Sequence, residues 1–297
     1  MKHWGQELLY FSECMRPRHF ATIARTRSRL FSLLDSPFYR NLLEVSPRLR
    51  RQHLTSYLSR SFNARSRHLA AFHHYQAVRK LLTEDFIVGL LADGVPLWIH
   101  TVEADEFCIV ATQNKLHPYE GDILLTLRQD GQRLFQVSFS IVPGKELNMD
   151  DDSVLLIGGA QGGRPEDEHL KHVVRTHSGV APSHLVLAAV RGVAQALDIS
   201  AIAGVSNAVQ LVKTRRGHEP FSFDYDAFWP MFGGLASEDG IFALPVQPYE
   251  KSLLEVPRTH RRRTRKKRQF KGEVAASVRG SLLNFLRAPR QENDSFS

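Results

Sequence analysis

The spacing of apolar residues along this chain changes at Gly94, and that change constrains the fold more than any single motif does. Over residues 7–90, apolar side chains recur three and four positions apart, as at Leu30, Leu33 and Leu34. This spacing places them on one face of a helix, with arginines on the opposite face. We therefore predict a layer of amphipathic helices before Gly94, interrupted at its prolines.

After Gly94 the residues favour strands. Ile, Leu, Val and Phe are concentrated in four short segments, residues 96–102, 107–112, 122–129 and 133–142. The Asp-Gly pair at residues 130–131 is typical of a tight hairpin between the last two segments. Within residues 134–141 polar and apolar residues alternate, which predicts one buried face. These features predict an antiparallel meander.

A different order of elements begins near residue 154. Residues 154–157 predict a short strand running into a glycine loop at 158–163, and Pro165 with the acids after it predicts a first helical turn. A second helix at 182–197 and a strand at 201–205 suit a crossover packed on the sheet. The predicted fold class is α+β: an N-terminal helical layer plus a mixed, largely antiparallel sheet with crossover helices. The predicted division is a basic helical region at 1–90, an α/β core domain at 91–250, and a basic C-terminal helix and tail at 251–297.

Composition narrows the protein class. Hydrophobic residues make up 42% of the 297 residues, which is enough for a folded core. No run reaches the roughly 18 to 20 apolar residues that cross a bilayer, and the N-terminus lacks a signal-peptide pattern. Two cysteines, Cys14 and Cys108, fit a reducing compartment and give no metal-binding spacing. We expect a cytoplasmic protein without a metal site. Any association with a membrane is expected at the surface of the inner membrane.

Charge is distributed unevenly. Residues 16–80 carry 14 Lys or Arg against two acids, and residues 258–271 carry nine against none. Residues 81–257 carry 24 acids against 12 basic residues. The basic flanks either dock on the acidic centre or attract an anionic partner such as RNA, an acidic lipid surface or a phosphorylated ligand. The candidate anion-binding residues are Arg261, Arg262, Arg263, Arg265, Lys266, Lys267 and Arg268.

The glycine stretch at 158–163 is the main candidate for binding a phosphorylated donor. Glycines let backbone amides approach a ligand, and the following helix end favours a phosphate. We therefore assign donor binding to Gln161, Gly162 and Gly163. The stretch has neither the P-loop pattern nor the spaced glycines of a dinucleotide site, which disfavours NTP hydrolysis and hydride transfer. The alternative is a structural glycine turn.

Two segments offer polar groups for chemistry. Asp224 and Asp226 alternate with aromatic residues, and paired carboxylates can bind a cation or act as general base, so both are candidate catalytic residues. Their alternative role is to cap the next helix. Ser206 and Asn207 follow a predicted strand, and with Tyr225 and Trp229 they are candidates for substrate binding.

Four segments together resemble the VirK/YbjX family of Gram-negative bacteria. They are residues 157–163, residues 181–189 with 204–207, residues 223–229 with 233–234, and residues 244–245 with 255–257 and the basic helix. The resemblance implies a role in virulence, in envelope properties and in resistance to antimicrobial peptides, and it implies no established catalytic residues. The order of elements is also similar to that of the N-acetyltransferase superfamily, with a partial match at the glycine loop.

Two functional hypotheses follow. The first is an acyltransferase that acts on an envelope precursor; the sequence leaves the cofactor open, with acyl-CoA as the candidate donor. The second is a non-catalytic protein that binds RNA or an anionic membrane surface through its basic flanks.

Overall fold

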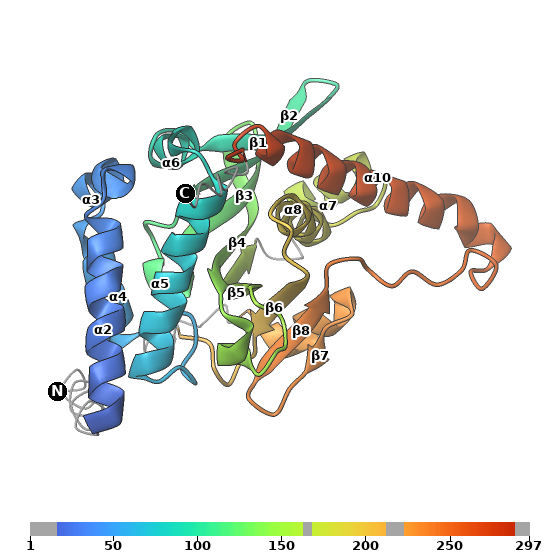
Figure 1. Ribbon diagram of the computed structural model, residues 1–297. Coiled ribbons are helices and arrows are strands. Elements are labelled where there is room, and N and C mark those ends of the chain that lie inside the picture. Colours follow the sequence, from blue (N-terminus) through green and yellow to red (C-terminus); the bar gives the residue numbers. More distant parts are fainter. Residues whose placement is uncertain (1–16, 163–167, 212–222, 289–297) are drawn as a thin grey trace, which may run out of the picture.

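A mixed sheet forms the centre of the computed structural model, which describes residues 17–162, 168–211 and 223–288 (Figure 1). Within these ranges the sheet has eight strands in the order β1-β2-β3-β4-β5-β6-β8-β7. The strands are β1 (Val95–Val102), β2 (Asp105–Gln113), β3 (Ile123–Gln129), β4 (Gln132–Val142), β5 (Val154–Gly162), β6 (Ala201–Val205), β7 (Leu235–Ala236) and β8 (Ile241–Pro245). Predictions concerning Cys14, Gly163 and Pro165 lie outside the described residues.

The first four strands form the predicted antiparallel meander. Asp130 and Gly131 both have positive φ, 47° and 80°, between β3 and β4. Two successive residues with positive φ give the backbone twist of a tight hairpin, so the Asp-Gly prediction is confirmed. A further antiparallel pair joins β4 to β5.

The pair β5–β6 is parallel, and a crossover connects its strands. Helices α7 (Glu168–Thr176) and α8 (Pro182–Ala196) lie in that connection, as predicted. Most of α8 is buried, because it lies between the sheet and the long helix α10 (Arg258–Leu283). The remaining strands, β8 and β7, extend the sheet beyond β6 in antiparallel fashion.

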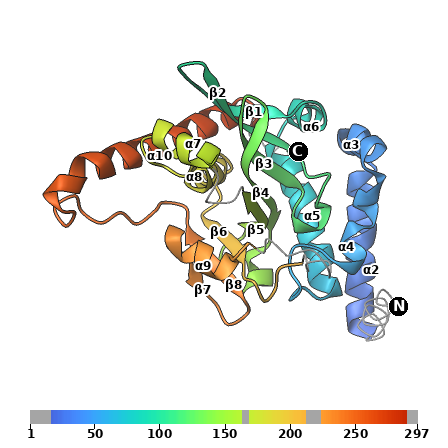
Figure 2. The same cartoon turned by 180° about the vertical axis from the view of Figure 1, so that it is seen from behind.

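Helices cover both faces of the sheet (Figures 1 and 2). On one side, α5 (Ala64–Leu81) packs against β4, and α2 (Pro17–Leu34) packs on α5. Short helices α3 (Arg40–Val45), α4 (Gln52–Thr55) and α6 (Glu84–Leu91) complete this layer. On the other side lie α7, α8 and α10. The predicted α+β class is therefore confirmed.

A buried carboxylate connects the first helical layer to the sheet. Asp122 accepts hydrogen bonds from Tyr75 Oη at 2.5 Å, Gln52 Nε2 at 2.7 Å and Ser140 Oγ at 2.7 Å. Tyr57 Oη also donates to this carboxylate. Donors from α4, α5 and β4, together with Tyr57, thus converge on one anionic group.

Two local predictions were wrong. The strand does not stop at Ile157; β5 runs through Gly162, and Gly159 and Gly162 pair with β4. They are needed for close packing, since a Cβ on Gly158 or Gly159 would collide with Glu120, and one on Gly162 with Phe135. The second error concerns β4, where Leu134–Val142 is buried on both faces because helices cover both sides of the sheet.

One hydrophobic cluster runs through the molecule. It includes Leu30 of α2, Val137 of β4 and Val278 of α10, which come from all three predicted regions. The three-part division of the chain stays a prediction.

Candidate active site

The parallel strands β5 and β6 separate partway along their length. They pair from Val154 with Ala201 to Ile157 with Gly204, after which β5 continues to Gly162 alongside β4. A β-bulge accompanies the separation, because Ser138 pairs with Gly159 and Phe139 with Ile157, so Gly158 is the extra residue. Bulges bend a strand and are common next to active sites.

Tyr225, the first residue of α9 (Tyr225–Phe228), lies against the separated edge of β5. The Ala160 amide donates a hydrogen bond to Tyr225 Oη at 3.0 Å. The N–H and C=O of one strand residue point to the same side, and residues two apart share that side. Ala160 and Gly162 therefore present their backbone groups to the edge that faces away from β4. Burial raises the pKa of Tyr225, and the negative charge of Glu120 raises it further.

Glu120 is the main acid–base candidate in this region. It ends the short 3-10 helix η3 (Pro118–Glu120) between β2 and β3, and Gln210 Nε2 donates to its Oε1 at 2.6 Å. Oε2 lies against Gly159 of β5. Burial raises the pKa of Glu120 from 4.5 to about 7, although the bond from Gln210 opposes the shift. A carboxyl group with this pKa exchanges a proton readily at neutral pH.

Ser206 supplies a second buried polar group at the end of β6. Its amide donates to Gly240 O at 2.9 Å, but its buried Oγ has no hydrogen-bond partner among the described residues. A buried hydroxyl without a partner costs free energy unless a ligand or water satisfies it. The substrate-binding role predicted for Ser206 stays a prediction.

The predicted aspartates form a local network with Asn207. Asp224 Oδ1 accepts the Ala227 amide at 3.1 Å, as N-cap of α9, and Asn207 Nδ2 at 2.8 Å. Asp226 Oδ1 accepts the Asn207 amide at 3.0 Å, and Asn207 Oδ1 accepts the Tyr225 amide at 2.9 Å. The bond from Asn207 is the main reason that the pKa of Asp224 is lowered. This network positions Tyr225, and a catalytic role for the aspartates stays a prediction.

The other predicted site residues lie in different surroundings. Trp229 is fully buried against Gly204, and its Nε1 donates to Val205 O at 2.7 Å. Gln161 pairs with Gln136 of β4, and Gln136 Nε2 donates to Gln161 Oε1 at 3.2 Å. Gly162 is a strand residue, and Gly163 lies outside the described residues. Donor binding by these three residues stays a prediction.

Sequence reasoning missed Glu120 and Gln210. Glu120 lies between β2 and β3, at the end of η3, and Gln210 follows β6; neither has a motif around it, and the two meet only in the folded chain. The sole signal was indirect: adjacent glycines in an apolar strand indicate that another group approaches the backbone closely.

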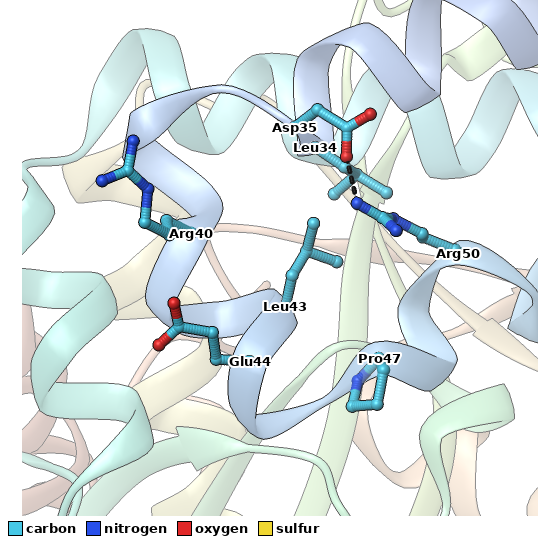
Figure 3. Close-up of a pocket in the computed structure, with 7 residues that line it drawn as sticks. All are labelled: Leu34, Asp35, Arg40, Leu43, Glu44, Pro47 and Arg50. Atoms are coloured by element: carbon cyan, nitrogen blue, oxygen red, sulfur yellow. Dashed lines mark hydrogen bonds and ion pairs between the residues drawn. The ribbon is translucent and has the colours of Figure 1, made fainter.

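A pocket elsewhere has a volume of about 300 Å³ and is lined by Leu34, Asp35, Arg40, Leu43, Glu44, Pro47 and Arg50 (Figure 3). Arg50 forms an ion pair with Asp35, so two of the charged side chains that line the pocket already neutralise each other. Across residues 17–162, 168–211 and 223–288, no group of three or more His, Cys, Asp or Glu side chains could hold a metal ion.

Comparison with known proteins places the chain in a family. The model of a family described as "Protein of unknown function (DUF535)" matches residues 16–279. The chain belongs to this DUF535 family. It is 26% identical over 225 residues to "Uncharacterized protein YbjX" of Escherichia coli (strain K12), a match covering 72% of this chain and 66% of that protein. The VirK/YbjX resemblance seen in the sequence is thereby confirmed. No solved structure matched significantly.

Proposed function

We propose that this DUF535 protein is an acyltransferase that moves an acyl group from a CoA thioester to a hydroxyl or amine of an envelope precursor, with Glu120 as general base. The observation that carries the proposal is a buried carboxyl group, with a pKa of about 7, at the separation of β5 from β6. Its pKa lets it accept a proton at neutral pH, as a general base must.

The shape of the sheet supports a CoA-type donor. The order of elements is similar to that of the N-acetyltransferase superfamily, with a meander, a strand, a crossover helix and a parallel strand. The separated edge of β5 offers the backbone groups of Gly162 to an extended ligand, whereas those of Ala160 are bonded to Tyr225. The pantetheine arm of CoA carries two amides and can bond to a strand edge as a peptide does.

The proposed step is a direct transfer. The Glu120 carboxylate removes a proton from the acceptor hydroxyl or amine while its oxygen or nitrogen attacks the thioester carbonyl. The carbon–sulfur bond then breaks, the acyl group stays on the acceptor, and the CoA thiolate takes up a proton. Ser206 Oγ, as a buried hydroxyl without a described partner, is available to stabilise charge on the carbonyl oxygen.

Glu120→Gln is expected to lower the rate of CoA release from acetyl-CoA or longer acyl-CoAs by about 100-fold to 10,000-fold, because it removes the general base. Thiol release is followed with and without an envelope extract as the source of acceptor. The wild-type rate should rise with pH through about 7, the pKa of Glu120. Glu84→Gln, at an exposed glutamate of α6, is the matched control and should keep the wild-type rate.

The same variant separates catalysis from folding. The pKa of Glu120 is higher in the folded chain, so its favourable contribution is complete below pH 4.5 and is lost as pH rises through about 7. Above pH 7 the folded state therefore bears a penalty of about 3 kcal/mol. Glu120→Gln should remove it and raise stability at pH 8. If no acyl-CoA stabilises the wild-type protein against heat, or if Glu120→Gln leaves thiol release unchanged, the proposal is wrong.

A further inference from the structure

Helix α10 is anchored mainly by Phe270, at its middle, and by its second half. Its buried residues are Val274, Val278 and Leu282, and it approaches α8 so closely that a Cβ on Gly192 would collide with Ala275 O. The first half extends away from the sheet, and the connection from β8 lies beside its beginning (Figures 1 and 2). The beginning of the densest run of positive charge thus lies on a projecting part of the helix.

The exposed side of this projecting part is basic. Residues on a helix are 100° apart, so Arg258, Arg262 and Arg265 lie on the side opposite Val274 and Val278. All three arginines are exposed, as are Arg263 and Lys266. No acidic residue occurs between residues 258 and 271. The three arginines and Lys266, here called the basic face, therefore present positive charge to one side.

The other arginines of the run fasten the connection from β8 along the helix. Arg261 donates to Leu254 O and Val256 O, both at 2.9 Å. Arg268 donates to Lys251 O at 2.7 Å and pairs with Glu250 at 3.2 Å. These two predicted anion-binding residues are therefore engaged within the chain, and they hold residues 250–256 beside the basic face.

Two large apolar side chains are exposed along the connection: Tyr249 directly precedes Glu250, and Leu254 accepts a hydrogen bond from Arg261. Tyr249 is 85% exposed and Leu254 is 80% exposed, the highest values among the large hydrophobic residues described. Together they are called the apolar tip. An apolar tip beside a basic face is the combination that binds the interface of an anionic bilayer, where charges meet head groups and apolar groups enter the acyl boundary. Nucleic acid would use the charges but gain little from an exposed leucine.

We propose that the first half of α10 and the apolar tip dock the protein on an anionic lipid surface. The docking does not depend on acyl transfer, so either proposal can fail alone. No helix in the described ranges is long and apolar enough to cross a membrane, and the docking needs none.

The test is flotation of the full-length protein with phosphatidylcholine vesicles, with and without phosphatidylglycerol. We expect binding only to the vesicles with phosphatidylglycerol, weakening as salt rises. Replacing Arg258, Arg262 and Arg265 with alanine should weaken binding about 100-fold, because each lost charge should weaken it about fivefold. The matched control replaces Arg25, Arg40 and Arg48, three exposed arginines of the other basic flank, and should bind like wild type.

The double variant Tyr249→Ser, Leu254→Ser tests the contribution of apolar insertion. It should lower vesicle binding about tenfold while leaving the salt dependence unchanged, because it removes apolar insertion and no charge. Circular dichroism should be unchanged for these surface variants. The proposal is overturned if the wild type does not bind phosphatidylglycerol vesicles, if the double variant binds them as wild type does, or if homopolymeric RNA competes fully for the protein.

Discussion

Replacing Asp122 with asparagine is expected to lower the free energy of unfolding by about 3–5 kcal/mol. Four side-chain donors converge on this carboxylate, from Gln52, Tyr57, Tyr75 and Ser140. Asparagine offers one acceptor oxygen, and its amide group would face donors instead of acceptors. Buried donors would then lose their partner, which costs more than the hydrogen bonds themselves contribute.

Urea denaturation measures this effect through the midpoint and the slope of the transition. Tyr75→Phe removes one of the donors and should cost less, about 1.5–3 kcal/mol. Asp93→Asn, at an exposed aspartate, should leave stability within about 0.5 kcal/mol of wild type. A loss of under about 1 kcal/mol for Asp122→Asn would show that this carboxylate does not hold the helical layer on the sheet.

Acidification is expected to destabilise the protein through two buried histidines of the helical layer. His53 and His68 are fully buried, and their rings contact edge to face at 4.7 Å. Burial lowers the pKa of His53 to about 3 and that of His68 to about 4, from 6.5. The folded state therefore resists protonation, while the unfolded state takes up protons below pH 6.5.

These lowered pKa values make the folded protein less stable as the pH falls. The contribution of the two neutral histidines to the free energy of unfolding is complete above pH 6.5. It is lost as the pH falls toward about 4 for His68 and about 3 for His53. At pH 5 each histidine should cost about 2 kcal/mol. Urea titrations at a series of pH values measure the slope of the free energy of unfolding against pH. His53→Phe should remove only the part of this slope that is due to His53, because burial also lowers the pKa of His74, His177 and His184. His260→Gln, at an exposed position, should not change the slope. Equal slopes for wild type and His53→Phe would contradict the assignment.

Local pattern in the sequence was sufficient for much of the fold. The change in apolar spacing at Gly94 predicted the helical layer and the meander, and the Asp-Gly pair at 130–131 predicted the hairpin that the structure contains. The crossover through α8 followed from the order of a buried strand, a helix and a second strand. These features depend on neighbouring residues in the chain, so their pattern is readable without the tertiary structure.

Only the tertiary structure brings together the groups of the candidate active site. Glu120 acquires its raised pKa because β5 and Gln210, from distant parts of the chain, enclose it. The glycines of β5 form a strand, not a loop, because Glu120 and Phe135 approach them closely, and β4 is buried on both faces because helices cover both sides of the sheet. Periodicity reports which side of an element is apolar, but the groups that meet across a fold depend on packing between elements far apart in sequence.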